Sequence, residues 1–279
     1  MKPFFLITND DGYAARGLKA LTEVAAEFGD VVVVAPEQNA SAKGLSLTTK
    51  VPVRVKEVRR SEFGGRSWKP TAHHGIRRSE LEADGTPGSL EVYACDGTPV
   101  DCLKLAYEHF CPRRPDLVLS GINHGSNSSI NVLYSGTMGA AIEAAVLGIP
   151  SIGFSLLNHS PEADFEPSRS IVRRIVSHVL EHGLPADTAL NVNIPRLSSD
   201  AIKGIRLCHQ AKGRWLDSFE KRVDPIGRPY WWLTGKFECD NPPDTSDEQA
   251  LADGYVSVVP IHTDFTHYEA IDQLKALCL

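Results

Sequence analysis

The sequence predicts an α/β protein built on a mostly parallel sheet, and three observations support this fold class. Residues 4–7 and 31–35 are apolar throughout, which is typical of strands buried on both faces. Apolar residues recur at helical spacing between these two segments. Strands that alternate with helices favour right-handed crossovers. We therefore expect a Rossmann-like three-layer arrangement, extended at its C-terminus by a β-hairpin that serves oligomerisation.

The composition is that of a globular protein. A chain of 279 residues with 42% hydrophobic residues can bury a sizeable core. We expect a single domain over residues 1–279, with its core in about 1–200 and an extension in about 201–279. A net charge of −6 argues against duplex nucleic acid as a partner and leaves a small molecule. No leader and no membrane-spanning run is evident, so we expect a cytoplasmic protein with no membrane partner.

The predicted elements follow one another in a regular order. The first strand is followed by a helix with apolar residues from Leu18 to Phe28, and Gly29 can end that helix. Residues 56–90 are charged and rich in glycine, which indicates an exposed excursion. Thr98, Pro99 and Asp101 have the pattern of a capped helix start. Further strands are expected at residues 31–35, 90–95, 117–120, 151–154, 190–195 and 255–260, and further helices at about 98–110, 135–147, 167–182 and from 268.

The segment 212–232 carries five aromatic residues among charged ones, around a turn at 224–227. It predicts a protruding hairpin that is too small to bury its own aromatic side chains. A hairpin folded back on its own sheet is the alternative. The aromatic residues are Trp215, Phe219, Tyr230, Trp231 and Trp232.

Two adjacent carboxylates, Asp10 and Asp11, follow the first strand directly. Ligands of parallel α/β sheets lie beyond the carboxyl ends of the strands. Neighbouring carboxylates repel each other, and a hard divalent cation such as Mg²⁺, Mn²⁺ or Ca²⁺ would neutralise the pair. The alternative is an ordinary turn, which Asp-Asp-Gly also favours.

Three further segments are expected at the same edge of the sheet. Ser41 lies in the loop after the second strand, and Asn123 and Asn127 lie in the loop after the strand 117–120. Residues 135–137, Ser-Gly-Thr, open a helix whose N-terminus could hold phosphate. Each segment also has an ordinary explanation, because polar loops are common and Ser135 or Thr137 could simply cap the helix.

Several blocks together resemble the SurE family of survival proteins, which are metal-dependent 5'-nucleotidases and acid phosphatases. The resemblance spans nearly the whole chain, in order. The blocks are residues 8–12 (TNDDG), 35–36, 41–42, 46–48, 96–99 (DGTP), 120–125, 134–137 (YSGT) and 191–195 (NVNIP).

The resemblance implies hydrolysis of phosphate monoesters of nucleoside 5'-monophosphates with one divalent cation. It implies that Asp10 and Asp11 are catalytic and bind the metal together with Ser41 and Asn123. Phosphate would be held by Asn9 and by Ser135, Gly136 and Thr137, and we add Asn127 to this group. Residues 128–131 and the long excursion depart from the usual family pattern. These departures bear on loop geometry and substrate preference. Water and an Asp side chain remain alternative nucleophiles.

Specific residues argue against the competing functions. Haloacid-dehalogenase phosphatases need Asp-x-Asp, and dinucleotide-binding folds need G-x-G-x-x-G after the first strand; neither occurs. A Mg²⁺-binding receiver-like signalling module is the main alternative, but it needs a phosphate-accepting Asp where this chain has Asn123.

The family resemblance also implies assembly. In SurE proteins the hairpin region and the C-terminal segment exchange between subunits, and the match includes Thr263, Asp264 and a nearby His267. We expect a homodimer or a homotetramer.

Overall fold

The computed structural model describes residues 1–58 and 89–278. Within them, one nine-stranded sheet has the order β3-β4-β2-β1-β5-β6-β7-β11-β8. Neighbouring strands from β4 to β7 are parallel, whereas β3 and β11 run antiparallel to β4 and β7. The strands are β1 (Phe4–Thr8), β2 (Asp30–Pro36), β3 (Val55–Glu57), β4 (Leu90–Cys95), β5 (Leu117–His124), β6 (Ser151–Leu156), β7 (Thr188–Ile194), β8 (Ile205–Leu207) and β11 (Val256–His262).

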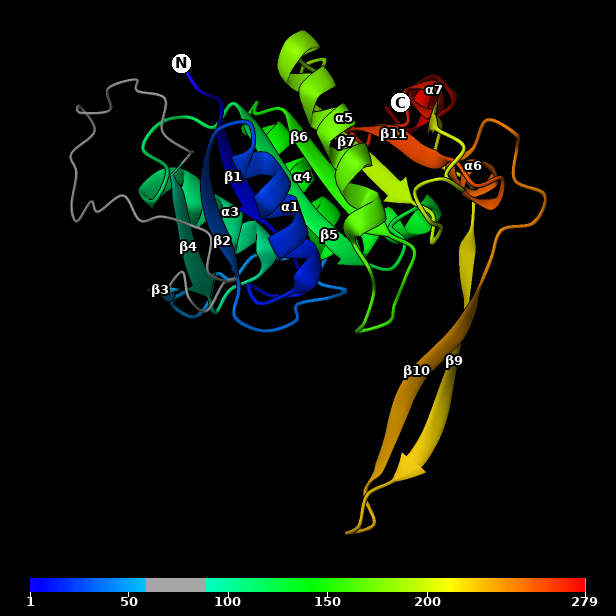
Figure 1. The fold of residues 1–279 in the computed structure, drawn as a ribbon. Helices are drawn as coiled ribbons and strands as arrows, with labels where there is room; N and C mark the ends of the chain where they lie inside the picture. The colour runs from blue at the N-terminus through cyan, green and yellow to red at the C-terminus, as the bar shows by residue number, and fades with distance from the viewer. Residues whose placement is uncertain (59–88, 279) are drawn as a thin grey trace.

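Helices cover both faces of this sheet, as Figure 1 shows. Helices α1 (Arg16–Ala26) and α5 (Glu166–His182) pack side by side on one face. Helices α3 (Pro99–His109) and α4 (Gly136–Val146) pack together on the other. The predicted three-layer α/β fold is confirmed.

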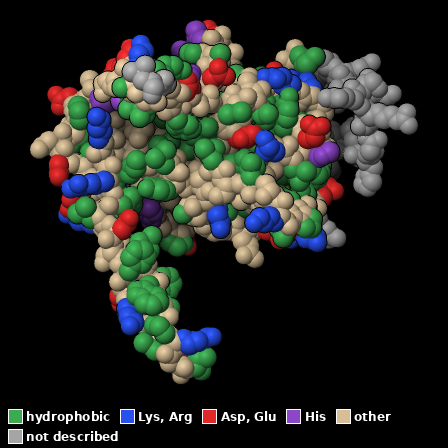
Figure 2. Space-filling view, turned by 180° about the vertical axis from the view of Figure 1, so that it is seen from behind, with side chains coloured by type: hydrophobic (Ala, Val, Ile, Leu, Met, Phe, Trp, Pro, Cys, Tyr) green, Lys and Arg blue, Asp and Glu red, His purple; other side chains and the backbone are tan. Residues whose placement is uncertain are grey.

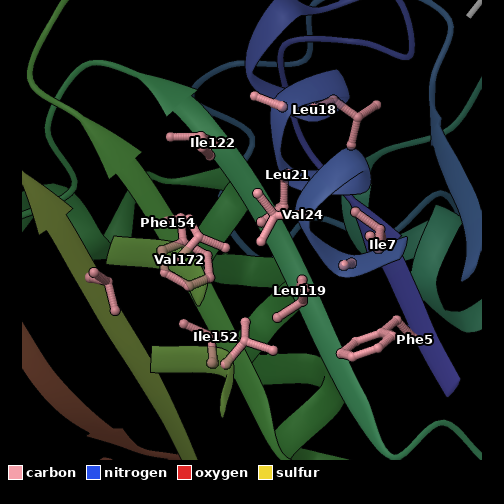
Figure 3. Close-up of a cluster of buried hydrophobic side chains, with 14 of the residues drawn as sticks. Phe5, Ile7, Leu18, Leu21, Val24, Leu119, Ile122, Ile152, Phe154 and Val172 are labelled. Atoms are coloured by element: carbon pink, nitrogen blue, oxygen red, sulfur yellow. The ribbon is translucent and has the colours of Figure 1, made fainter. Parts of the chain in front are cut away.

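Alternation along β1 divides the core into two layers. Phe5 and Ile7 join the cluster under α1 and α5, where they lie near Leu21 and Leu119 (Figure 3). Phe4 and Leu6 point to the opposite face and pack with residues of α3 and α4. Successive side chains of a strand point to opposite faces, so an unbroken apolar run fills both layers. The apolar composition of β1 is thereby explained.

The start of α3 has the predicted capping box. The Thr98 hydroxyl accepts the backbone N–H of Asp101 at 3.1 Å, and the Asp101 carboxylate accepts the backbone N–H of Thr98 at 2.8 Å. Pro99 occupies the first turn, where a missing N–H costs no helical hydrogen bond. Strand β5 is longer than predicted, because it continues past Ser120 to His124 and includes Asn123.

The hairpin after β8 is the most extended part of the molecule. Strands β9 (Arg214–Val223) and β10 (Pro229–Glu238) pair over ten positions from each strand and project away from the sheet (Figure 1). Large apolar side chains remain exposed on it, so it does not fold back on its own sheet (Figure 2). The predicted C-terminal hairpin is confirmed. The chain ends with α6 (Asp247–Ala252), β11, α7 (Tyr268–Gln273) and a 3-10 turn (Lys275–Cys278).

Two expectations from the sequence remain, one on the excursion at 56–90 and one on membrane-spanning segments. The expected excursion at 56–90 falls largely on residues 59–88, which lie outside the described part of the chain. In residues 1–58 and 89–278, no helix has the length and apolar character needed to cross a membrane.

Candidate metal and phosphate site

Asp10 is the most deeply buried carboxylate at the carboxyl edge of the parallel strands. Only 3% of the residue is exposed. Its Oδ1 accepts the hydroxyl of Thr137 at 2.7 Å, and its Oδ2 accepts the backbone N–H of Thr137 at 3.1 Å. Burial raises the pKa of Asp10, although these bonds to the start of α4 lower it. The first turn of α4 and the end of β1 therefore form one unit.

Gly136 permits this close approach. A Cβ atom added at Gly136 would lie 2.9 Å from the Cβ of Asp10, which is closer than such atoms normally come. Ser135 caps the same helix, because its hydroxyl accepts the backbone N–H of Met138 at 3.0 Å. The hydroxyl hydrogen of Ser135 can still be donated to a ligand.

Asp11 lies beside Asp10 but is less buried. Burial, followed by the charge of Asp10, raises the pKa of Asp11 to about 6. Its Oδ2 accepts the backbone N–H of His124 at 3.0 Å, and this bond opposes the rise. Two neighbouring carboxylates with raised pKa values favour either a shared proton or a bound cation.

Ser41 is brought near the pair by the backbone of its loop. The N–H of Ala40 donates to the carbonyl oxygen of Asp10 at 2.7 Å, and the N–H of Gly44 donates to the carbonyl of Tyr134 at 3.1 Å. Ser41 itself is exposed, and its N–H donates to the side chain of Asn39. In the described part of the chain, its hydroxyl makes no hydrogen bond to either Asp.

Asn123 lies at the end of β5, next to the residue that contacts Asp11. It is buried, and its Nδ2 donates to the carbonyl oxygen of Gly125 at 2.9 Å. Because the amide nitrogen is used in this way, the amide oxygen is the atom that can act as a cation ligand. Asn123 is thus placed at the same edge as Asp10 and Asp11.

Asn127 is buried and anchors its loop to the sheet. Its Nδ2 donates to Ser155 at 2.7 Å, its N–H donates to Asn193 at 2.8 Å, and its carbonyl accepts Asn191 at 2.8 Å. The structure therefore engages the donors of Asn127 with β6 and β7. A phosphate contact by Asn127 would need a different arrangement of this side chain.

Asn9 is completely buried between Thr8 and the Asp pair. Its Nδ2 donates to the carbonyl of Gly12 at 3.0 Å, whereas its Oδ1 has no hydrogen-bond partner among the described residues. An unpaired buried oxygen is costly in a folded protein. At the end of a strand beside two carboxylates, such an oxygen fits a site that is completed by a ligand.

The donor set fits a hard divalent cation. No three His, Cys, Asp or Glu side chains gather into a metal-binding group in residues 1–58 and 89–278. Two carboxylates, a hydroxyl and an amide oxygen remain as candidates, and oxygen ligands of this kind suit Mg²⁺ or Mn²⁺ better than Zn²⁺. The candidate ligands are Asp10, Asp11, Ser41 and Asn123.

Comparison with known proteins decides the family. Residues 5–217 match the family model described as survival protein SurE. The chain belongs to the SurE family. The resemblance noted in the sequence is thus confirmed.

The relatives of this SurE family member match over the full chain. A protein named 5'-nucleotidase SurE from Christiangramia forsetii is 46% identical over 100% of this chain and 98% of its own length. One of the same name from Flavobacterium johnsoniae is 44% identical over 98% and 96%. The crystal structure of the SurE protein from Aquifex aeolicus has a TM-score of 0.77 at 37% identity, and covers 99% of both chains.

The side chains that anchor the site were not predicted from the sequence of this SurE chain. Asn191 and Asn193 are buried polar residues within β7, and they hold the loop at Asn127. Two asparagines in an otherwise apolar strand were the available signal. Asp247 is also fully buried and bonds to the backbone of Ser129. No sequence pattern joins residues so distant in the chain.

Proposed function

We propose that this SurE family member is a metal-dependent phosphatase that hydrolyses nucleoside 5'-monophosphates. Relatives named 5'-nucleotidase SurE, 43–46% identical to the chain, support an enzyme of the 5'-nucleotidase class. The observation that carries the proposal is the carboxylate pair at the end of β1, in which Asp10 is buried and Asp11 half-buried. Asp10 is held by the first turn of α4, and the pKa of Asp11 is raised to about 6.

The carboxylate pair defines where a cation would be held. Asp10, Asp11, Ser41 and Asn123 would supply its oxygen ligands. When bound, a divalent cation supplies positive charge that offsets the charge developing on the phosphoryl oxygens. Thr137 has the complementary task, since its hydroxyl and N–H keep Asp10 oriented and favour its ionised form.

The phosphate group would lie against the start of α4. The positive end of the helix dipole faces this region, and it favours an anion as well as the Asp10 carboxylate. Ser135 can donate its hydroxyl hydrogen, while Gly136 leaves room for close approach. Asn9 is expected to contribute the second hydrogen of its Nδ2, because the first is donated to Gly12 and its Oδ1 can only accept.

A receiver-like signalling module is less well supported by the site. Such a module accepts a phosphoryl group on an Asp at the end of a later strand. Here β5 ends in Asn123 and His124, and Asn123 is bonded to the backbone of its own loop. An amide side chain does not hold a phosphoryl group stably. The residues at this edge therefore fit hydrolysis of a phosphate ester better than storage of a phosphoryl group.

The test is phosphate release from a panel of nucleoside monophosphates. Purified protein would be assayed with Mg²⁺, with Mn²⁺ and after EDTA treatment. We expect release that depends on the added cation and is abolished by EDTA. Full activity in metal-stripped protein would contradict metal dependence, and a lack of release from every nucleotide would contradict the substrate class.

We also propose a homodimer or homotetramer formed through the hairpin and the C-terminal segment. The support is the exposed apolar surface of β9 and β10, together with exposed Tyr268, Ile271 and Leu274 near the C-terminus. Isolated patches of this kind mark interfaces. Deletion of the residues after Pro260 should reduce the mass found by light scattering. A full-length monomer at micromolar concentration would refute the assembly and leave the catalytic proposal intact.

A further inference from the structure

One buried carboxylate joins the C-terminal extension to the loop that leads into the site. Oδ2 of Asp247 accepts the backbone N–H of Ser129 at 2.7 Å. Oδ1 accepts the N–H of Ala211 at 2.9 Å and that of Glu248 at 2.8 Å. Asp247 is 0% exposed, so water cannot take the place of its carboxylate as the acceptor for these backbone N–H groups. Three segments that are distant in sequence therefore meet at one side chain.

The hydroxyl of Ser129 strengthens the same junction. It donates to the carbonyl of Ala211 at 2.9 Å and accepts the N–H of Gly213 at 2.8 Å. A Cβ atom at Gly213 would lie 2.7 Å from this hydroxyl and 2.3 Å from the ring of Phe237, so a larger residue would force these side chains to move. Trp215, at the start of β9, donates its Nε1–H to Asn131 at 2.8 Å. The hairpin base and the segment after Ser129 are thus held together.

The position of Ser129 in the chain gives this junction its importance. Ser129 begins the 3-10 turn η1 (Ser129–Leu133), which leads through Tyr134 to the Ser135 cap of α4. On its other side, Asn127 is fixed to β7. Helix α6 lies beside the base of the hairpin (Figure 1). The carboxylate of Asp247 therefore fixes the connection that delivers residues 135–137 to Asp10.

We propose that Asp247 is a positioning residue for the phosphate end of the site, an inference that rests on the proposed phosphatase function. It acts through residues 129–135 on the start of α4. The cation ligands depend on this connection less directly. Asp11 follows β1 and Asn123 belongs to β5, which pairs with β6, whereas Asp10 also bonds to Thr137 in the first turn of α4. Loss of Asp247 should consequently weaken phosphate contacts more than cation binding.

Asp247→Asn is the most selective variant, because it preserves the size of the side chain. The two carboxylate oxygens accept different N–H groups. Either orientation of an amide would point an NH₂ group at one of these donors. The variant therefore breaks one side of the junction and leaves the other intact.

The experiment measures binding of inorganic phosphate in the presence of Mn²⁺, and of Mn²⁺ alone, by calorimetry. KM and kcat for a nucleoside monophosphate, the melting temperature and the mass by light scattering are measured on the same samples. Asp116→Asn is the control. Asp116 also accepts a distant backbone N–H, that of Phe4 at 2.7 Å, but it lies at the opposite edge of the sheet.

For Asp247→Asn we expect phosphate affinity to fall and KM to rise about tenfold, the loss typical when a residue that orients a ligand-binding group is changed. Mn²⁺ affinity should fall by a smaller factor than phosphate affinity, because Asp11 and Asn123 are held by β1 and β5, and the mass should stay close to wild type. Asp116→Asn should lower the melting temperature without changing phosphate affinity. If Asp247→Asn does not fold, Ser129→Ala, which removes the hydroxyl bonds to Ala211 and Gly213, is measured in the same way and should lower phosphate affinity.

Two outcomes separate the proposals. A wild-type protein that releases no phosphate from any nucleotide contradicts the proposed function. An active wild type whose Asp247→Asn variant, or Ser129→Ala in its place, keeps its phosphate affinity and KM contradicts the positioning role alone. The positioning role is also overturned if Asp247→Asn and Asp116→Asn lose the same phosphate affinity. The loss would then follow from lower stability.

Discussion

The carboxyl edge of the sheet and the hairpin β9–β10 place side chains in opposite environments. At the sheet edge, charged Asp10 is 3% exposed and its neighbours Asn9 and Thr137 are completely buried. On the hairpin, apolar Phe219 and Leu233 are 65% and 63% exposed and face each other across the two strands. Each arrangement is unfavourable for an isolated chain, since buried charge and exposed apolar surface both cost free energy.

The contrast indicates which kind of partner would stabilise each region. A pair of neighbouring carboxylates, one of them buried, is stabilised by a cation, and an exposed apolar surface is stabilised by another protein surface. The apolar side chains are divided unequally between the two faces of the hairpin. Paired residues of β9 and β10 share a face, so one face carries Trp215, Phe219, Val223, Trp231 and Leu233, and the other carries Leu216, Tyr230 and Trp232. We therefore expect the first region to bind a cation and the second to contact another subunit. These two expectations can be tested independently.

The largest effect is expected at the carboxylate pair. Asp10→Asn or Asp11→Asn should reduce phosphatase activity by several orders of magnitude, because one lost carboxylate leaves the cation poorly held. Phosphate release with saturating Mn²⁺ is the measurement. Asp96→Asn is a suitable control, since Asp96 follows β4 at the same edge but contacts Arg54 on the surface. Equal losses in Asp96→Asn and Asp10→Asn would show that the pair has no special role.

A charge on the apolar face of the hairpin should disrupt the proposed assembly. Phe219→Lys should weaken association by roughly thirtyfold, because a central aromatic residue contributes about 2 kcal/mol or more to an interface. Sedimentation over a range of concentrations would give the dissociation constant. Ser218→Lys adds the same charge on the other face of β9 and should have a smaller effect. If both variants associate like wild type, the hairpin is not the interface.

Thr137→Val tests the link between α4 and Asp10. The bond from the Thr137 hydroxyl lowers the pKa of Asp10, so its removal should raise that pKa further. Protons then compete better with the cation, and we expect about tenfold weaker Mn²⁺ binding near neutral pH, a loss that decreases at higher pH. Calorimetry at several pH values measures this.

Thr22→Val is the matched control for that variant. Thr22 is also buried, in α1, and its hydroxyl has no partner among the described residues. Its replacement should leave cation binding unchanged. Equal Mn²⁺ affinity in Thr137→Val and wild type at every pH would mean that Thr137 does not act through Asp10.

The smallest effect concerns stability of the metal-free protein. The pKa of Asp11 is raised from 3.8 to about 6 in the folded state, so the folded protein binds more protons than the unfolded chain between these values. Stability should therefore fall as pH rises from about 4 to about 6, by a few degrees in melting temperature. Added Mn²⁺ should reverse the fall, because it favours the ionised carboxylates. The dependence should be weaker in Asp11→Asn, and a melting temperature that rises over this range in the wild type but not in the variant would contradict the assignment.

The fold class was predictable because its signals are local. An unbroken apolar run such as β1 has to be buried on both faces, and Thr98 with Asp101 caps a helix through neighbours in the chain. The hairpin was also predictable from its turn and its aromatic residues. Residues 10 and 11 could be placed at the carboxyl edge because parallel strands present that end to ligands.

The tertiary structure alone decided which partners these residues have. Thr137 bonds to Asp10, Asn127 is bound by Asn191 and Asn193, and Asp247 holds Ser129. Each contact joins segments far apart in the chain, and it exists because crossovers and packing bring those segments together. An Asp in the first turn of a helix or a buried Asn has the same local sequence signature whichever partner it finds. Local pattern therefore determined the elements and the edge, and packing determined the hydrogen bonds that position the site.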